Sequence, residues 1–296
     1  MFRDIFHSLR PNQWTKNAVL LAALFFASGD RSQHQQILAG LQRVLPAVLI
    51  FCLISSGIYV LNDILDIESD RRHPRKRFRP IAAGRVSVTT AMRLGLGLLL
   101  GGAMLAWMLS WQFAVVAGSY IALQTAYSLF LKHVPLVDVL LIAAGFVIRA
   151  IAGAVALNVS ISPWLLLCAF LLALFLALCK RRHEKVQMAG AMGDTRPSLE
   201  DYDERLLDQL ISIVAGATIV CYAIYTLSPQ TIDKFGTARL GFTIPFVVFG
   251  IFRYLDLVYR HEKGDRPEKI LLTDLPILVN LALYGLSVVV IFVLPR

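Results

Sequence analysis

The chain has 296 residues, of which 57% are hydrophobic and 17% are charged, and its formal net charge is +9. Soluble domains are closer to half apolar, so this composition argues against an ordinary soluble protein. The basic residues border long apolar runs, which argues against a nucleic-acid partner and makes the net charge a marker of membrane topology.

Charge-free apolar runs dominate the chain, and about twenty apolar residues are enough to cross a bilayer as a helix. The sequence therefore predicts an all-α, polytopic membrane protein, one domain over residues 1–296 built as a bundle of nine transmembrane helices. The expected spans lie near residues 17–29, 44–62, 88–109, 112–130, 136–157, 162–180, 209–228, 240–259 and 274–294. Ser110 marks the expected turn between the third and fourth spans, and residues 158–163 divide the fifth from the sixth.

The distribution of Lys and Arg predicts the orientation of this bundle. With nine spans, most of the 29 basic residues fall in segments that share one side of the membrane with the amino terminus. By the positive-inside rule, the amino terminus is expected in the cytoplasm and the carboxyl terminus outside. The charged clusters fall on the same side, so an active site is expected to face the cytoplasm.

The first span has a polar entry, residues 9–14, which is typical of an interfacial helix with an aromatic anchor. Lys16 follows it and could point into a cavity or toward anionic lipid, and the sequence does not separate these alternatives. Tyr59 precedes Asp63 by one helical turn. Its hydroxyl could reach the same site as Asp63, or it could be an ordinary interfacial tyrosine.

The segment 62–84 organises the rest of the chain, because it places acids first and bases second at the end of an apolar run. On a helix, Asp63, Asp66 and Asp70 would share one face, with Asn62 close by. Neighbouring carboxylates repel one another, and a divalent cation would relieve that repulsion. Oxygen-only ligands favour Mg²⁺, which usually keeps several waters and takes further ligands from a substrate phosphate.

Bases follow these acids in one short loop, which His73 and Pro74 are expected to open by ending the helix. A plain alternative is a helix-end acid cluster followed by a positive-inside loop, as many membrane proteins have. Three acids that meet six bases at one membrane edge favour a magnesium-diphosphate site over an anchor. The six bases are Arg71, Arg72, Arg75, Lys76, Arg77 and Arg79.

Arg149 lies in the middle of an apolar run, where a charge costs about 2.5–3.5 kcal/mol on insertion scales. We therefore expect it to face a polar cavity or an anion. The alternatives are an arginine that extends to the interface or one that pairs with a buried acid. Gly145 and Gly153 in the same run would allow close contact between helices.

Other chemistries have little support in the sequence. The histidines lack the spacing of zinc ligands, and no nucleotide-binding or serine-hydrolase motif is present. The four cysteines lie in or beside apolar runs without a CxxC pair, so they are expected to be small buried residues. A lipid or solute transporter should show inverted repeats or matching broken spans, and the sequence shows neither.

At NDILDIESD the chain resembles the UbiA-type intramembrane prenyltransferase superfamily, whose first acidic motif has the form NDxxDxxxD. Further motifs, among them RPNQWTKN at 10–17, HPRKRFRPIAAG at 73–84 and KRRHE at 180–184, are similar to its decaprenyl-phosphate phosphoribosyltransferase branch. The resemblance covers nearly the whole chain. One departure is that KRRHEKVQMAG stands where the superfamily carries a second acidic motif.

This resemblance implies a protein of the bacterial inner membrane that uses Mg²⁺. It would transfer a 5-phosphoribosyl group from 5-phosphoribosyl 1-diphosphate to a polyprenyl (decaprenyl) phosphate. Asn62 and Asp66 would be the metal ligands, and the catalytic acids would be Asp63, Asp66 and Asp70. The substrate-binding residues would be Lys16, Tyr59, Lys76, Arg77, Lys132, Arg149, Lys180 and Arg181. A homo-oligomer is left open.

An alternative within the same fold is the transfer of a polyprenyl chain from its diphosphate to an aromatic or other small acceptor. The basic segment 73–80 and the missing second acidic motif argue against it. A sugar diphosphate with a 5-phosphate carries anionic groups at both ends, so it would need one metal site and separate bases. The sequence offers one acidic cluster and a surplus of bases.

Overall fold

The computed structural model describes residues 2–28, 37–74, 76–188, 202–260, 270 and 272–293, and within these residues the secondary structure is entirely helical. In chain order the α-helices are α1 (Phe2–Ser8), α2 (Val19–Ser28), α3 (Ile37–Leu65), α4 (Ile67–Arg72), α5 (Val88–Leu109), α6 (Trp111–Leu129), α7 (Val137–Leu157), α8 (Pro163–Met188), α10 (Glu204–Leu227), α11 (Pro229–Phe235), α12 (Ile244–Arg260) and α14 (Leu275–Val293). The 3₁₀ helices are η1 (Pro11–Ala18), η2 (Lys76–Phe78), η3 (Leu131–His133) and η4 (Arg239–Thr243).

Seven helical segments among the described residues are long and apolar enough to cross a membrane. They correspond to α3, α5, α7, α8, α10, η4 with α12, and α14. The two other expected spans coincide with α2, which has ten described residues, and with α6, which has 19. The count of nine spans and the sides of the two termini therefore stay predictions.

Local sequence explains where most helices begin and end. Ser110 serves both neighbours, because its backbone N–H closes α5 and its hydroxyl accepts from the N–H of Phe113 at the start of α6. Pro163 opens α8, a position where its missing N–H costs nothing. Helix α4 ends at Arg72 with an extended His73, which confirms the expected stop before Pro74. Helix α8 runs eight residues beyond the predicted end at 180.

The helices of the amino-terminal half approach closely where glycine replaces a side chain. A Cβ on Gly153 of α7 would lie 2.2 Å from the carbonyl oxygen of Leu20 in α2. A Cβ on Gly102 of α5 would lie 2.6 Å from Ile54 of α3. Without a hydrophobic driving force inside lipid, such small-residue contacts hold helices together. The predicted close contact at Gly153 is confirmed.

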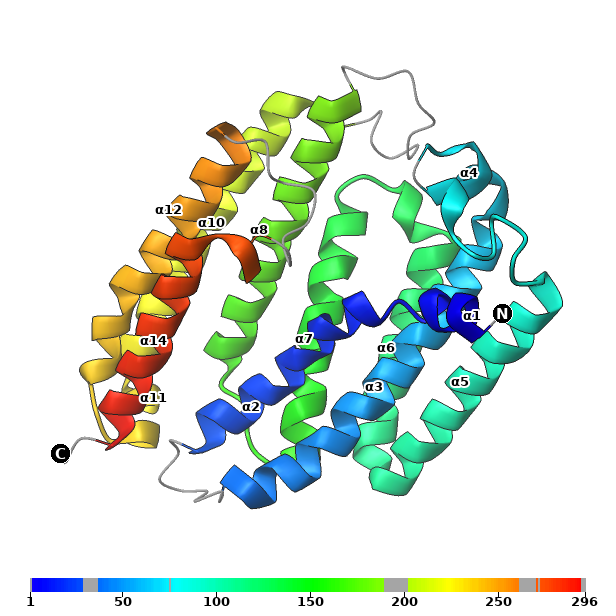
Figure 1. Ribbon diagram of the computed structural model, residues 1–296. Coiled ribbons are helices and arrows are strands. Elements are labelled where there is room, and N and C mark those ends of the chain that lie inside the picture. Colours follow the sequence, from blue (N-terminus) through cyan, green and yellow to red (C-terminus); the bar gives the residue numbers. More distant parts are fainter. Residues whose placement is uncertain are drawn as a thin grey trace.

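In Figure 1 the helices α3, α5 and α6 form one side of the bundle, α10, α12 and α14 form the other, and α7 and α8 lie between them. Helix α4, the last turns of α8 and the first turns of α10 lie at the same end of the bundle, at the top of the view. The charged clusters predicted to share one side of the membrane are therefore at one end. All four cysteines are free and buried, as expected.

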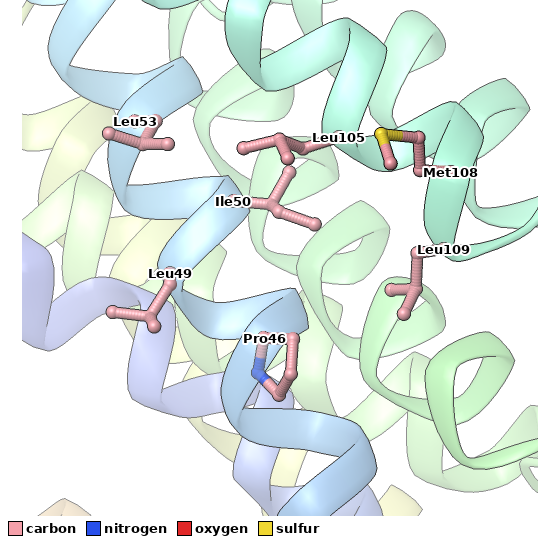
Figure 2. Close-up of a pocket in the computed structure, with 7 residues that line it drawn as sticks. All are labelled: Pro46, Leu49, Ile50, Leu53, Leu105, Met108 and Leu109. Atoms are coloured by element: carbon pink, nitrogen blue, oxygen red, sulfur yellow. The ribbon is translucent and has the colours of Figure 1, made fainter.

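The largest groove is open and entirely apolar, with a volume of about 340 Å³ between α3 and α5. Figure 2 shows Ile50 of α3 directed toward Leu105 of α5, beside the point where Pro46 interrupts the hydrogen bonds of α3. The remaining lining residues are Leu49, Leu53, Met108 and Leu109. A groove without polar groups offers nothing that would bind a phosphate, so the candidate site lies elsewhere.

Candidate active site

The acidic segment does not form one helical face, which corrects the expectation from the sequence. Helix α3 ends at Leu65, and Asp66 leaves helical geometry with φ −96° and ψ 9° before α4 begins at Ile67. The break turns the side chains before and after it in different directions. The three carboxylates therefore separate into a buried pair, Asp63 and Asp70, and a single acid, Asp66.

The buried pair is closed by arginines. Asp63 and Asp70 are 3% and 2% exposed. The Nη1 of Arg79 donates to Asp63 Oδ1 at 3.1 Å and to Asp70 Oδ2 at 2.6 Å. Arg10 also donates to Asp63, and its guanidinium lies 5.2 Å from the ring centre of Tyr59. Burying two carboxylates is costly unless cations pair with them, so this cluster ties the amino-terminal segment and the basic loop to α3 and α4.

Asp66 has different partners. Its Oδ1 accepts from Lys132 Nζ at 2.6 Å, and its Oδ2 accepts from the Asn62 amide at 3.1 Å. The Asp66 side chain is 25% exposed and that of Lys132 is 11% exposed. A lysine ammonium is a compact, strongly hydrated charge on a flexible stem, which makes this ion pair easier to open than an arginine pair. Asn62, Asp66 and Lys132 thus form an accessible group at the end of α3.

The donor atoms of this group fit a hard divalent cation. Asn62 and Asp66 offer an amide oxygen and a carboxylate, which are the ligand types that Mg²⁺ prefers, and Mg²⁺ keeps several waters when few protein ligands are present. Within the described residues no three His, Cys, Asp or Glu side chains are grouped as a complete metal site. The residues present therefore fit a metal that is bound partly by the protein and partly by water or substrate.

The other bases of the loop differ in their surroundings. Arg77 is exposed and stacks on Phe78, with 4.9 Å between its guanidinium carbon and the ring centre. Lys76 is half-buried in η2, where its backbone N–H donates to His73 Nδ1 at 3.3 Å. Lys16 is half-buried in η1. The structure gives none of these three a contact with Asp66 among the described residues.

Arg149 is buried deep in the bundle and does not extend to an interface. Its Nε donates to Asn17 Oδ1 at 2.9 Å, and its Nη2 donates to the Tyr120 hydroxyl at 2.6 Å. Its Nη1 donates to the carbonyl of Gly145 at 3.2 Å, and its guanidinium lies over the rings of Tyr120 and Phe146. These described partners are neutral, so the cation is held by dipoles and aromatic rings, not by an acid.

This arginine is separated from the acidic group. Arg149 lies twelve residues after the start of α7, which corresponds to roughly 18 Å along the helix axis. A series of polar contacts runs along η1 and α3 in the same direction. Asn17 also donates to Ser55 at 3.3 Å, and Trp14 Nε1 donates to Ser56 at 3.0 Å. The amino-terminal segment thus carries polar groups from the acids toward the bundle interior.

Arg181 and Lys180 lie in a second charged cluster. The Nε of Arg181 donates to Asp138 Oδ2 at 2.8 Å, and its Nη1 is also paired with Glu184. Lys180 lies 4.0 Å from Glu184. Asp138 and Arg181 are both buried, so this pair ties α7 to α8 inside the protein. The structure does not bring either base to Asp66.

Tyr202 completes the second cluster. Its hydroxyl donates to Asp138 Oδ1 at 2.7 Å and accepts from the backbone N–H of Leu136, also at 2.7 Å. Burial and the hydrogen bond to the carboxylate raise the pKa of Tyr202 above its usual value. Leu136 has φ 66° and ψ −42°, a sparsely populated conformation that costs about 1–3 kcal/mol for a residue with a side chain.

Sequence reasoning missed the partners of the acids. It treated Arg79 as one of six loop bases, and it did not select Arg10, Asp138 or Tyr202. Their partners lie 9 to 66 positions away in the chain. A buried acid signals that some cation must approach it, but spacing alone does not say which one.

Comparison with known proteins places the chain in a family. It matches the model of the UbiA prenyltransferase family over residues 18–275. It is 38% identical over 277 residues to the decaprenyl-phosphate phosphoribosyltransferase of Mycolicibacterium smegmatis, covering 90% of this chain and 85% of that protein. It is 36% identical over 271 residues to the protein of the same name from Corynebacterium glutamicum, covering 90% of this chain and 80% of that one.

A solved structure supports the same fold. The structure of a UbiA homolog from Archaeoglobus fulgidus bound to GPP and Mg²⁺ matches with a TM-score of 0.72 at 18% sequence identity. The match covers 98% of this chain and 100% of that chain. At this identity the likeness shows the fold alone. Because the family model, the curated relatives and the helical fold agree, this chain is an integral-membrane transferase that belongs to the UbiA prenyltransferase family.

Proposed function

We propose that this protein transfers the 5-phosphoribosyl group of 5-phosphoribosyl 1-diphosphate to a polyprenyl phosphate, in a reaction that depends on Mg²⁺. The observation that carries the proposal is the contrast between one accessible acid, Asp66, and several carboxylates that are closed by arginines. Relatives named decaprenyl-phosphate phosphoribosyltransferase, which match 90% of the chain, support the same reaction.

The second charged cluster bears on the choice between the two candidate reactions. Glu184 is paired with Arg181, and Asp208 accepts from Arg182 Nε at 2.6 Å and from the Tyr259 hydroxyl at 2.9 Å. These carboxylates stand near the place where a second acidic motif would hold a second metal. Because arginines engage them, the described residues offer one metal position and not two, which favours the phosphoribosyl donor over a polyprenyl diphosphate.

Asn62 and Asp66 would hold the metal, and Mg²⁺ would neutralise the diphosphate of the donor. Lys132, now against Asp66, is placed to accompany the diphosphate once that ion pair opens. Asp63 and Asp70 support the site by fixing Arg79 and Arg10. Lys16, Lys76 and Arg77 border the same end of the bundle and would meet further phosphate oxygens.

Tyr59, Arg149, Lys180 and Arg181 remain part of the proposal in a different sense. The Tyr59 ring supports Arg10, and Arg149 supports the amino-terminal segment through Asn17. Arg181 and Lys180 act on the site through the structure around Asp138. Their contacts in the described residues are with the protein, so their effect on substrates is indirect.

The chemistry requires little of the protein beyond charge stabilisation. A phosphate oxygen of the lipid attacks the anomeric carbon of the ribose, the bond from that carbon to the diphosphate breaks, and diphosphate leaves. The transition state is oxocarbenium-like, so stabilising the leaving diphosphate is the main task. A phosphate acceptor is already ionised near neutral pH, so no strong general base is needed.

The topology belongs to the same proposal. We infer nine spans, a cytoplasmic amino terminus, an external carboxyl terminus, and an active site that faces the cytoplasm in a bacterial inner membrane. The gathering of α4 with the charged ends of α8 and α10 at one end of the bundle supports a single charged face.

The test is a transfer assay on the purified protein in detergent, with 5-phosphoribosyl 1-diphosphate, decaprenyl phosphate and Mg²⁺, run with and without a chelator. We expect a phosphoribosyl lipid whose formation the chelator abolishes and added Mg²⁺ restores. Absence of that product, together with prenylation of an aromatic acid when a polyprenyl diphosphate is supplied, would refute the proposal and favour the alternative reaction.

A further inference from the structure

The chain that carries Lys132 runs into a strained turn. Three residues after η3, the segment Pro135–Val137 forms a γ-turn in which the Val137 N–H donates to the Pro135 carbonyl at 2.8 Å. The central residue, Leu136, has φ 66° and ψ −42°. This form of the γ-turn is rare, and positive φ is unusual for a residue as bulky as leucine. A strained residue persists only where the surrounding structure holds it.

Tyr202 holds this turn from a distant part of the chain. Its hydroxyl oxygen accepts the Leu136 N–H at 2.7 Å, and its proton is donated to Asp138 Oδ1 at 2.7 Å. Arg181 Nε donates to the other carboxylate oxygen at 2.8 Å. Tyr202, Asp138 and Arg181 are all buried, so water does not compete for these bonds. The Leu136 N–H is therefore fixed by a network that spans α7, α8 and the segment before α10.

We propose that Tyr202 is a positioning residue that acts through Leu136 to keep Lys132 against Asp66. The inference rests on the proposed function in so far as Lys132 and Asp66 belong to the site. Lys132 lies four residues before Leu136, in a segment whose direction is set by the turn. Without the Tyr202 hydroxyl, Leu136 relaxes toward negative φ, the preceding segment turns, and the Lys132 ammonium moves away from the Asp66 carboxylate.

The test compares Tyr202→Phe with Tyr222→Phe in the full-length protein. Tyr222 is a matched control because it is also a buried tyrosine of the same stretch of chain, and its hydroxyl bonds to Thr243 at 2.6 Å and to Tyr284 at 3.1 Å, not to the turn. A merely structural loss of a buried hydroxyl should affect both variants. A positioning role should change Lys132 in the first variant alone.

The readout is the rate at which a water-soluble acylating reagent modifies the Lys132 amine, measured by mass spectrometry without ligands, with Lys234 of α11 as internal reference. We expect severalfold faster modification of Lys132 in Tyr202→Phe and no change in Tyr222→Phe. In the transfer assay, kcat of Tyr202→Phe should fall about tenfold or more, because small misplacements of a charged group are costly, while the KM for the lipid stays unchanged.

Two substitutions at Leu136 test the strain directly and do not alter the Tyr202 contacts. The Leu136 side chain is exposed, so its replacement creates no cavity. Leu136→Val should speed the modification of Lys132, because a β-branched residue tolerates positive φ poorly. Leu136→Gly should leave it unchanged and, combined with Tyr202→Phe, should return it toward the wild-type rate, because glycine adopts positive φ at no steric cost.

Modification of Lys132 at the wild-type rate in Tyr202→Phe, or equal rates in Leu136→Val and Leu136→Gly, would overturn the inference. Faster modification with unchanged kcat would overturn its functional half. If Tyr202→Phe does not fold, the Leu136 pair decides alone. If the wild-type protein transfers no phosphoribosyl group, the proposed function fails, and the modification rates still decide whether Tyr202 positions Lys132.

Discussion

Two charged regions lie at one end of the bundle and use similar residues in different ways. The amino-terminal charged region consists of Arg10, Asn62, Asp63, Asp66, Asp70, Arg79 and Lys132. The carboxyl-terminal charged region consists of Asp138, Lys180, Arg181, Arg182, Glu184, Tyr202 and Asp208. In the second region each of the three carboxylates is paired with an arginine. In the first region Asp66 is held by a lysine and an amide instead.

The difference follows from the chemistry of the partners. A guanidinium offers several donors in a fixed plane, so it joins carboxylates of separate helices and holds them in one geometry. The Arg181–Asp138 pair joins α8 to α7, and the Arg182–Asp208 pair joins α8 to α10. A lysine on a flexible stem can leave its partner. The comparison teaches that an acidic residue at a membrane edge becomes a candidate ligand only where arginine has not already claimed it.

The largest expected effect separates the two regions by activity. Asp66→Ala should lower kcat/KM for phosphoribosyl transfer by about a hundredfold to a thousandfold, because it removes a charge that helps to stabilise the leaving diphosphate. The melting temperature in the same detergent should change little, since Asp66 is partly exposed. Asp208→Ala is the control from the other region and should retain most activity. Equal losses in both variants would contradict the distinction.

The next effect separates the regions by stability. Arg181→Met leaves the buried Asp138 carboxylate without its cation, so the free energy of unfolding should fall by about 3–5 kcal/mol. Lys132→Met opens a pair at the margin of the protein and should cost about 1 kcal/mol or less. Unfolding by a denaturing detergent measures both. A larger loss of stability in Lys132→Met than in Arg181→Met would reverse the assignment.

A third prediction concerns the helix contact below the amino-terminal region. In Gly153→Ala the new methyl group would meet the backbone carbonyl of Leu20, so α2 must move, and stability should fall by about 1–3 kcal/mol. Gly216→Ala in α10 is a matched control, because a Cβ there has no neighbour within 4 Å. That change should be neutral or stabilise the helix by up to about 1 kcal/mol. Thermal unfolding of the two variants side by side checks the contrast.

The smallest effect is expected at the exposed edge of the amino-terminal region. Arg77→Ala removes a side chain that stacks on Phe78, and stability should change by no more than about 0.5 kcal/mol. If Arg77 meets a substrate phosphate, KM for the donor should rise severalfold at constant kcat. Arg79→Ala, which frees two buried carboxylates, should destabilise the protein far more. A strongly destabilised Arg77→Ala would show that the loop is organised differently.

Much of the helical architecture was predictable because it depends on short stretches of sequence. The serine that separates α5 from α6 and the proline that opens α8 act on their immediate neighbours. The length of α8 was underestimated, because a run of charges after 180 continues the helix where an apolar criterion ends it. The two expected spans at α2 and α6 rest on shorter or more polar sequence, so they are the least secure part of the predicted count.

By itself the sequence determined that the protein is a helical membrane protein and that its acids gather at the end of α3. It also placed a cation, Arg149, deep inside an apolar helix. Only the tertiary structure decided which acids are closed by arginine, which one remains accessible to a metal, and that neutral dipoles surround Arg149. The physical reason is that a buried charge is stabilised by whichever partner reaches it in space, and those partners come from residues far apart in the chain.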